Sequence, residues 1–258
     1  MPLSIADYEQ MNPVMTVNWE GTEVIYSTPT TTALNRVETL PTKEPDTIGW
    51  IERFKEGEIF VDIGANIGIY SIWAALSRQV SVFAFEPESQ NYGELNKNIF
   101  YNDLSPQVRA YCVALSNQSG FDDLHLSGFA IGSSCHSFGE EVDFNLEPTK
   151  ASMVQGCYST TLDELVAKNV IPIPHHIKID VDGIEHLVVQ GAMNVFANPQ
   201  VKSLLVELNT NLEIHRSLVG EIVPLGFELS YHERDAAIRK EGKFKGIGNH
   251  IFWRHTNP

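Results

Sequence analysis

Short apolar segments alternate with longer segments in which apolar residues recur every three or four positions. The short segments predict five strands, at residues 59–63, 80–85, 108–115, 176–181 and 201–208. The longer ones predict four helices, at residues 67–77, 89–100, from after the fourth strand to about 196, and 212–225. Strands and helices that alternate in this way form a mostly parallel, doubly wound α/β sheet with helices on both faces.

The two ends of the chain depart from this alternation. Residues 15–19 and 23–26 predict a hairpin with Glu20 and Gly21 in its turn, and 46–54 predicts a helix capped by Asp46. Residues 227–231 and 250–254 predict two closing antiparallel strands joined by a loop rather than a helix. Residues 117–160, rich in Gly, Ser and Asp, predict an insertion with short strands in place of a crossover helix. We therefore expect an N-terminal segment, 1–45, and one domain over 46–258.

Charge and cysteine usage limit the class of function. The chain has 258 residues with 18 Lys and Arg against 33 Asp and Glu, a net charge of −15, which disfavours a nucleic-acid partner. We expect no membrane span, because no apolar run approaches the roughly 18 residues that one needs. The first basic residue is Arg36, so no secretory or transit signal is expected. Cys112, Cys135 and Cys157 lack metal-ligand spacing, which predicts free buried thiols in a cytoplasmic protein.

A glycine-containing turn follows the first strand, in Phe60-Val-Asp-Ile-Gly-Ala-Asn-Ile-Gly68. Asp62 stands at the end of the strand, and Gly64 and Gly68 bracket a turn into a helix whose N–H groups can bind a carboxylate or phosphate. The spacing differs from the G-x-G-x-x-G of nicotinamide dehydrogenases. A strand–turn–helix without a ligand is the alternative.

Glu86 ends the second strand, 18 residues after Gly68. An acidic residue at this place in an open α/β sheet accepts hydrogen bonds from ribose hydroxyls. The alternative is a cap for the next helix, a role that Glu88 or Ser89 can also fill. Together, turn and carboxylate indicate a nucleoside that carries an anionic group, either the carboxylate of S-adenosylmethionine or a pyrophosphate.

A third acidic group surrounds the end of the fourth strand. Asp180 lies at the carboxyl edge of the sheet, where ligands bind in such folds. Asp182 and Glu185 fit a capping box at the start of the next helix. Glu207 and Asn209 end the fifth strand, so we expect Asp180, Glu207 and Asn209 to converge on one cleft. There they orient cofactor or substrate, or hold Mg²⁺, a metal to which the sequence does not commit.

These motifs, taken in order, closely resemble the FkbM-type family of S-adenosylmethionine-dependent methyltransferases. The resemblance rests on Asp62-Ile-Gly-Ala-Asn-Ile-Gly68, Phe85-Glu-Pro87, Val113-Ala-Leu-Ser116 with Gly120, Thr161-Leu-Asp-Glu-Leu165, Lys178-Ile-Asp-Val-Asp-Gly-Ile-Glu185 and Val206-Glu207. It implies a Rossmann-like class I fold of seven strands in the order 3-2-1-4-5-7-6, the last antiparallel. It also implies methyl transfer from S-adenosylmethionine to an oxygen, less often a nitrogen, of a small molecule, sugar or glycan.

The resemblance also assigns roles to residues. It places Gly64, Ala65, Asn66 and Gly68 around the methionine part of the cofactor, Glu86 on the ribose, Ala114, Leu115 and Ser116 beside the adenine, and Asp180 opposite the methyl donor, with Asp62 and Tyr70 in the same cofactor set. The chain departs from the family pattern at Asp182, where Glu is frequent, and at His186, where an apolar residue is usual.

Catalysis is expected to depend mainly on alignment of acceptor, methyl and sulfur, with proton removal by Asp180, Glu207 or His186 secondary. For His186 the favoured alternative is a solvated surface residue. The histidines form no zinc motif. A dinucleotide-dependent oxidoreductase and a non-catalytic nucleoside-binding protein remain as alternatives, and segment 1–45 is expected to help cover the acceptor pocket.

Basic residues are concentrated near the C-terminus. They are Arg234, Arg239, Lys240, Lys243 and Lys245. The interspersed acidic residues and glycines fit a solvated connection. The alternative is a loop that closes over an acceptor with a phosphate or carboxylate, where local positive charge offsets the acidic background.

Overall fold

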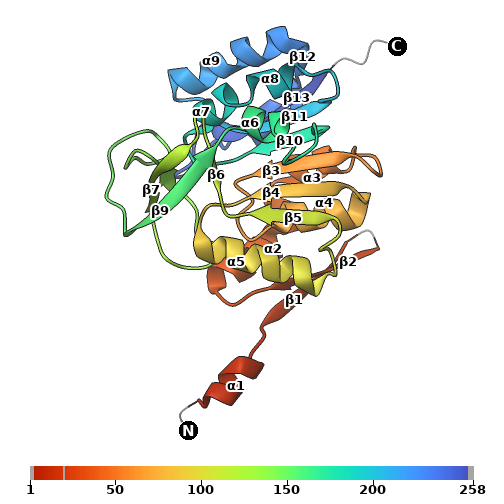
Figure 1. The fold of residues 1–258 in the computed structure, drawn as a ribbon, viewed down its shortest axis with the longest axis vertical. Helices are drawn as coiled ribbons and strands as arrows, with labels where there is room; N and C mark the ends of the chain where they lie inside the picture. Colours follow the sequence, from red (N-terminus) through yellow and green to blue (C-terminus); the bar gives the residue numbers. More distant parts are fainter. Residues whose placement is uncertain (1–2, 20, 255–258) are drawn as a thin grey trace.

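The computed structural model describes residues 3–19 and 21–254. Its main body is a seven-stranded sheet in the order β12 (Phe227–Leu229), β13 (Ile247–Arg254), β11 (Ser203–Asn209), β10 (His176–Ile179), β3 (Ile59–Ile63), β4 (Ser81–Phe85) and β5 (Val108–Tyr111) (Figure 1). β13 is antiparallel to both neighbours, while β11, β10, β3, β4 and β5 pair in parallel. If the strands of this sheet are renumbered 1 to 7 in chain order and read from β5, their order is 3-2-1-4-5-7-6. This confirms the predicted fold class.

Two hydrophobic cores lie on opposite faces of this sheet. Along β3, Phe60 belongs to one core and Val61 to the other, and Leu205 and Leu204 divide in the same way along β11. This alternation follows from the period of two in a strand. The first core is covered by α2 (Thr31–Lys43), α3 (Pro45–Ile51), α4 (Ile69–Arg78) and α5 (Ser89–Tyr101). The second is covered by α6 (Leu162–Ala167), α7 (Glu185–Gln190), α8 (Met193–Ala197), α9 (Glu213–Ile222) and the 3-10 turn Val223–Leu225.

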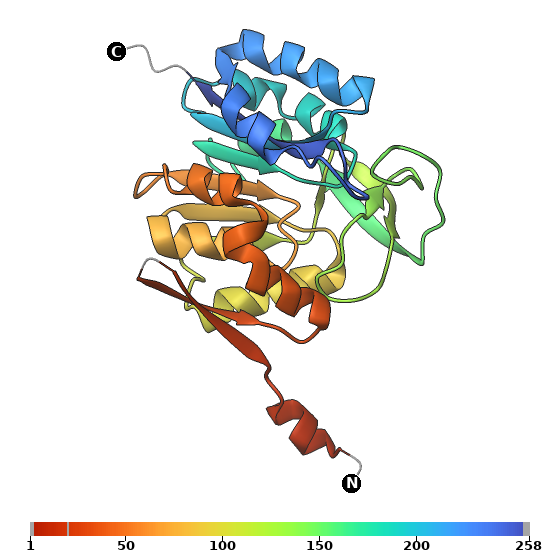
Figure 2. The ribbon, with the colours of Figure 1, turned by 180° about the vertical axis from the view of Figure 1, so that it is seen from behind.

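The N-terminal segment packs on the first core. After α1 (Ile5–Gln10), which lies apart from the body, β1 (Val14–Trp19) and β2 (Thr22–Ser27) form the predicted hairpin (Figure 2). Glu20 of its turn lies outside the described residues. Tyr26 is fully buried and donates from its hydroxyl to the carbonyl of Ile69, 2.7 Å away. The hairpin is thereby fastened to the start of α4.

Helix α2 and the start of α3 differ from the sequence prediction. Thr30 caps α2 by accepting from the N–H of Ala33 at 3.0 Å, although the Thr-rich composition of this stretch, weak in helix propensity, had not indicated a helix. The predicted cap Asp46 is wrong, because α3 begins at Pro45 and Asp46 lies inside it. The Asp46 carboxylate instead accepts from the Asn249 amide of β13 at 2.8 Å.

The segment predicted to be an insertion, 117–160, supplies three of the four strands of a second sheet. Its order is β6 (Ala114–Leu115), β9 (Met153–Thr160), β7 (Gly120–Leu126) and β8 (Ser137–Phe138). The third predicted strand, 108–115, is divided between β5 of the main sheet and β6 of this one. The helix predicted to run to about 196 is interrupted at Gly191, where a Cβ would lie 2.1 Å from the Ser116 carbonyl oxygen. Neither break is visible in local periodicity, since both are set by contacts between distant segments.

The closing strands are antiparallel as predicted, but their connection contains a helix, α10 (Tyr231–Ala237), so the prediction of a plain loop is wrong. No residue of α10 is fully buried, so the sequence carries no apolar stripe that would reveal it. The expectation of three buried thiols is wrong in part, because only Cys157 is buried, while Cys112 is exposed and Cys135 intermediate. All three are free. Within the described part of the chain, no helix has the length and apolarity that crossing a membrane requires.

Candidate active site

The turn after β3 is held in a conformation that glycine alone tolerates. Gly64 and Gly68 have φ of +80° and +81°. A Cβ on Gly64 would lie 1.8 Å from the carbonyl oxygen of Asp180, so the glycine permits close approach of β3 and β10. A glycine is expected here because a ligand needs the space next to the turn. The structure gives a different reason for the glycine. A side chain there collides first with the backbone of Asp180.

Glu86 faces the turn from the end of β4. Its carboxylate accepts from the N–H of Asn66 at 2.8 Å and from the N–H of Glu88 at 2.9 Å. The side chain is buried, and burial raises its pKa to about 7. Glu88 is the residue that caps α5, accepting from the N–H groups of Gln90 and Asn91. Glu86 is therefore not needed as a helix cap.

A cavity lies over this turn, and we call it the turn cavity. From the cofactor set predicted by sequence it takes Gly64, Asn66, Glu86, Ala114, Leu115 and Asp180. The remaining lining residues are Ile63, Phe85, Pro87, Val113, Leu124, Ser133, Ser134, His136, Phe138, Val181, Asp182 and Ile184. The predicted residues Asp62, Ala65, Gly68, Tyr70 and Ser116 are not among them.

The insertion supplies the part of this cavity that sequence reasoning missed. Asn66 donates from its amide to the carbonyl of Ser133 at 2.7 Å, and Asn91 donates to the same oxygen at 3.1 Å. Arg36 of α2 donates to the neighbouring carbonyl of Gly132 at 2.6 Å. These bonds hold the segment around Ser133 across the cavity. The sequence showed it only as a cluster of Gly and Ser.

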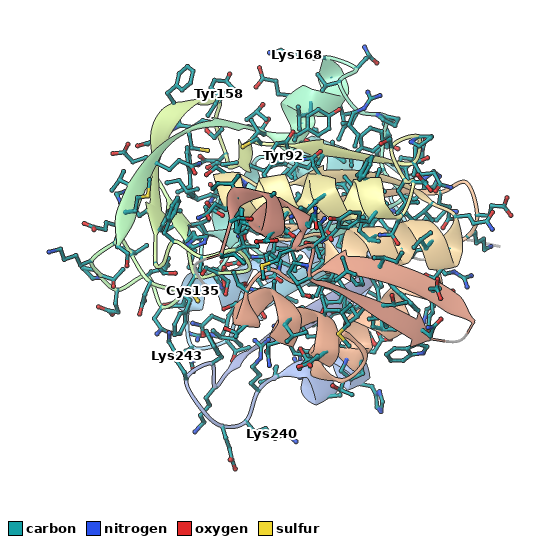
Figure 3. The ribbon with its side chains drawn as sticks, turned by 90° about the horizontal axis from the view of Figure 1, so that it is seen from below. Tyr92, Cys135, Tyr158, Lys168, Lys240 and Lys243 are labelled. Carbon is teal, nitrogen blue, oxygen red and sulfur yellow. The ribbon has the colours of Figure 1, made fainter. Side chains whose placement is uncertain are left out.

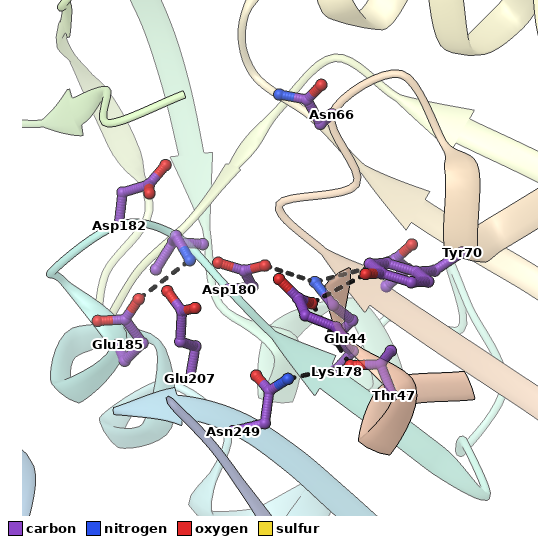
Figure 4. A network of polar contacts seen from close by, with 12 residues as sticks. Glu44, Thr47, Asn66, Tyr70, Lys178, Asp180, Asp182, Glu185, Glu207 and Asn249 are labelled. Carbon is purple, nitrogen blue, oxygen red and sulfur yellow. Dashed lines mark hydrogen bonds and ion pairs between the residues drawn. The ribbon is translucent and has the colours of Figure 1, made fainter. Parts of the chain in front are cut away.

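Below the turn lies a buried ionic network (Figure 4). The ammonium of Lys178, a residue that is 2% exposed, donates to Asp180 at 2.9 Å and lies 3.8 Å from Asp62. Burial opposes the charge on Asp180, yet the Lys178 ammonium holds the pKa of that carboxyl below its usual range. Asp62 also accepts from the Ser71 hydroxyl at 2.6 Å, so it supports the site from beneath. In the sequence, the sign that could have revealed this network is Lys178, a charged residue within an apolar strand.

Tyr70 joins the same network. Its hydroxyl donates to Glu44 at 2.9 Å, and its ring centroid lies 5.5 Å from the Lys178 ammonium. Tyr70 and Glu44 are both buried. The network thus connects the strand β10 to the junction of α2 and α3, which lies in the N-terminal segment.

A second cavity adjoins the first and is rich in charge, and we call it the charged cavity. Arg36 and Lys43 of α2 and Arg239 beyond α10 supply its cations. The two cavities share the wall formed by Gly64, Asn66, Ser134, Asp180 and Asp182. The charged cavity is completed by Glu44, Glu207 and Phe244. Segment 1–45 therefore contributes side chains to it.

Arg239 crosses the charged cavity. It donates to Glu207 at 2.8 Å and to Glu44 at 3.3 Å. Of the other basic residues in this region, Arg234 pairs with Asp235, and the Lys243 ammonium lies 5.2 Å from the Phe144 ring centroid. Lys240 and Lys243 project from the loop that follows (Figure 3).

Asp180, Asp182 and Glu207 come together, with one oxygen of each lying within 4.8 Å of the others. Burial raises the pKa of Asp182 to about 6 and raises that of Glu207 well above its usual range. The prediction that Asn209 joins them is wrong. Its amide donates instead to the Phe144 carbonyl at 3.1 Å, and it lines neither cavity.

The predicted capping box is also wrong. Helix α7 begins at Glu185 with Ile184 as its N-cap, and Asp182, at φ 61°, accepts from the N–H of Cys135 at 2.7 Å. Glu185 accepts from the N–H groups of Val181 and Gly183, and burial raises its pKa to about 8. Both carboxylates therefore fix the loop after β10 rather than cap a helix.

His186 lies on α7, with its ring centroid 5.7 Å from that of His215. It is not among the residues that line the turn cavity or the charged cavity. The geometry thus brings Asp180 and Glu207 to the site and leaves His186 outside it.

Comparison with known proteins gives the chain its relatives. Hexuronic acid methyltransferase AglP of Haloferax volcanii is 27% identical over 164 residues, which are 63% of this chain and 61% of that protein. Methyltransferase sdnD of Sordaria araneosa is 34% identical over 71 residues, 27% of each chain. The matches therefore span less than two thirds of the length of these relatives. Methyltransferase FkbM of Methylobacillus flagellatus superposes with a TM-score of 0.49 at 16% identity, over 78% of this chain and 44% of its own.

The match to a family profile shows to which family the chain belongs. The profile of the methyltransferase FkbM domain matches residues 62–232, more than half of the chain. The matched region runs from Asp62 through the turn, Glu86, the insertion and the Asp180 loop to α10. The chain belongs to the methyltransferase FkbM domain family.

Proposed function

We propose that this protein transfers the methyl group of S-adenosylmethionine to an oxygen of an acidic sugar or glycan. The observation that carries the proposal is the shared wall of the two cavities. A donor in one cavity and an acceptor in the other would meet at Gly64, Asp180 and Asp182. Family membership supports the same reaction class.

The turn cavity offers polar and apolar contacts that suit the cofactor. Glu86 offers carboxylate lone pairs to the ribose hydroxyls, in addition to those used by the N–H groups of Asn66 and Glu88. Leu115, Leu124 and Phe138 give apolar contact for the adenine ring. When bound, S-adenosylmethionine supplies a methyl group activated on a sulfonium centre. The lining residues are in keeping with that group.

The acidic residues of the charged cavity have different roles in the proposed reaction. Asp180, kept charged by Lys178, stabilises positive charge beside it and orients the acceptor hydroxyl. Asp182 has a pKa of about 6, so its carboxylate takes the hydroxyl proton near neutral pH. Glu207 is held by Arg239 and fixes the far wall. Placement of the acceptor contributes more than the base does.

The class of acceptor follows from the cations of the charged cavity. Arg36, Lys43 and Arg239 come from two distant segments of a chain with net charge −15. Because Arg239 is held by Glu207 and Glu44, the argument for the acceptor rests on Arg36 and Lys43. Guanidinium groups favour carboxylates and phosphates. AglP is described as a hexuronic acid methyltransferase, which supports a carboxylate-bearing sugar as acceptor here.

The decisive experiment has two stages. Calorimetry with S-adenosylhomocysteine tests the turn cavity, and release of S-adenosylhomocysteine from S-adenosylmethionine is then measured with matched acceptors, glucuronic acid conjugates against glucose conjugates. We expect binding and turnover, with the acidic series preferred. Absence of cofactor binding would refute the donor assignment, and equal turnover of both series would refute the acidic acceptor.

A metal is a separate question for the same site. Lys178 neutralises Asp180 and Arg239 neutralises Glu207, so two of the three clustered carboxylates already have cationic partners. We therefore expect turnover to survive EDTA treatment. Loss of turnover with EDTA and its recovery with Mg²⁺ would reassign Asp180, Asp182 and Glu207 as metal ligands.

A further inference from the structure

A third cavity lies on the other face of the main sheet from the charged cavity. We call it the histidine cavity, and it is bounded by β11, α9, β12, α10 and β13. Its volume is about 430 Å³, within the usual range for small-molecule sites. The lining residues are Leu208, Thr210, His215, Arg216, Val219, Leu229, Tyr231, Arg234, Ile238 and His250. Glu207 and Leu208 are adjacent in β11, so the strand separates this cavity from the charged one.

The walls of the histidine cavity are apolar. Leu208 and Leu229 are buried in the second core, and Val219 and Ile238 face the same space. Apolar lining of this kind favours a ligand with a hydrocarbon body, because such a ligand leaves water when it binds.

The charged lining residues are all cationic. Arg216 and Arg234 line the cavity, and no Asp or Glu is found among the described residues that do so. Arg234 pairs with Asp235, which is largely exposed, while Arg216 donates to the Thr210 carbonyl. Each guanidinium keeps further N–H donors for a ligand anion. Two arginines without a lining carboxylate are unexpected in a chain of net charge −15.

The two imidazoles of the cavity do not add charge. His215 accepts from the N–H of Asn209 at Nδ1 and donates from Nε2 to the Gly183 carbonyl, 2.9 Å away, which fixes its neutral tautomer. His250 contacts the Gly248 carbonyl through Nδ1 at 2.9 Å. Burial lowers the pKa of both histidines to about 4, so an apolar ligand meets neutral rings.

We propose that the histidine cavity is a binding site for a small organic anion with an apolar body, of the class of medium-chain or aromatic carboxylates. The carboxylate pairs with Arg216 and Arg234 and the body contacts Leu208, Val219 and Leu229. His215 lies between this cavity and Gly183, which follows Asp182. We therefore expect a ligand in the histidine cavity to perturb the Gly183 loop of the candidate active site through His215. The inference does not depend on methyltransferase activity.

The test uses octanoate and its neutral counterpart octanamide, titrated into the full chain by calorimetry at low ionic strength. We expect one octanoate per chain and binding of octanamide weaker by about tenfold or more, from the loss of charge-assisted hydrogen bonds. In ¹⁵N-labelled protein, the amide signal of Gly183 should shift with octanoate. Failure of octanoate to bind, or equal binding of both probes, overturns the proposal.

Variants locate the binding. Val219→Trp fills the cavity, and Arg216→Gln with Arg234→Gln removes the cations from an exposed and a half-buried position. Both should weaken octanoate binding by about tenfold or more, with the melting temperature as the fold control. Arg239→Gln in the charged cavity should leave it unchanged. Loss of binding in Arg239→Gln with retention in the arginine pair would place octanoate in the charged cavity and overturn the proposal.

Discussion

At the scale of single residues, Glu86 shows how burial and hydrogen bonding prepare a carboxylate for the ligand contact that we propose. Its oxygens already accept two backbone N–H groups, and burial raises its pKa to about 7. A hydroxyl donor from a ligand is then a favourable third partner, because it compensates part of the desolvation cost.

Replacing Glu86 by Gln tests this directly. We expect Glu86→Gln to weaken S-adenosylhomocysteine binding by roughly 10- to 100-fold, since hydrogen bonds to a charged group contribute about 1.5–3 kcal/mol each. The measurement is calorimetry, with melting temperature alongside. Glu88→Gln is the matched control, because Glu88 is buried two residues away and caps α5 without lining the turn cavity. It should lower stability and spare affinity, and an affinity of Glu86→Gln within twofold of the wild type would contradict the ribose assignment.

Asp180 is bound to its site by a buried partner. Asp180→Asn leaves the Lys178 ammonium with Asp62 as its remaining buried carboxylate, 3.8 Å away. We expect turnover to fall by roughly 100-fold, the scale of a lost positioning group, with a smaller change in cofactor affinity. Single-turnover kinetics with S-adenosylhomocysteine calorimetry separates the two effects. A variant with unchanged turnover would show that Asp180 only supports the fold.

At the scale of elements, the sequence predicted the main sheet because four of its strands, β3, β4, β10 and β11, are short and mostly apolar and are each followed by a helix. The failures share one cause. Helix α10 has no buried residue, the break at Gly191 depends on the distant Ser116, and the division between β5 and β6 depends on pairing with β9. None of these is encoded by local periodicity.

The residues of the candidate site likewise fall into those that the sequence predicted and those that it did not. Gly64, Asn66, Glu86 and Asp180 lie at strand ends and were predicted from the sheet topology, since carboxyl ends of parallel strands meet at one edge. Ser133 and Glu44 reach the cavities from the insertion and the N-terminal segment, and no pattern within those segments marks them. Asn209 also stands at a strand end, yet it is turned toward Phe144 by two amide hydrogen bonds.

Helix α2 carries the element-scale prediction. It lies outside the region matched by the family profile and presents Arg36 and Lys43 to the charged cavity. Arg36→Gln with Lys43→Gln should raise KM for a carboxylate-bearing acceptor by roughly tenfold and flatten its salt dependence. Because Arg36 also holds the Gly132 carbonyl beside the turn cavity, Lys43→Gln is the single variant that should leave S-adenosylhomocysteine affinity alone. Steady-state kinetics at two ionic strengths measures this, with Arg53→Gln, an exposed ion-paired site, as control. An unchanged acceptor KM at low ionic strength would remove α2 from the acceptor site.

At the scale of the whole molecule, buried titratable groups of two kinds set how stability depends on pH. The pKa values of His176, His215 and His250 are lowered to about 4 by burial. A group with a depressed folded pKa stabilises the fold above its unfolded value, which is 6.5 for histidine, and loses that contribution as pH falls toward 4. The histidines therefore lower the stability of the folded state as the pH falls, and only above about pH 7.5 are they neutral in both the folded and the unfolded chain.

The carboxyl groups act in the opposite direction, and they decide the alkaline side. Burial raises the pKa of Glu86 to about 7 and of Glu185 to about 8, from ordinary values of 4.5. Such groups stabilise the fold fully below pH 4.5 and lose that contribution as pH rises through their folded pKa values. Between about pH 7.5 and 9 the histidines are neutral in both states while Glu86 and Glu185 ionise, so the free energy of unfolding should decrease with pH.

Chemical denaturation at about pH 7.5 and pH 9 measures this decrease. Glu185→Gln keeps an oxygen that can accept from Val181 and Gly183 while removing the ionisation, so it should flatten the dependence, by an amount on the order of 1 kcal/mol per pH unit for one titrating group. Glu164→Gln is the matched control, since that carboxylate is lowered in pKa to about 2 and does not titrate in this window. A free energy of unfolding that is constant or rises from about pH 7.5 to 9 would mean that Glu86 and Glu185 ionise in the folded protein as readily as in the unfolded chain, and that burial does not hold either carboxyl in its neutral form.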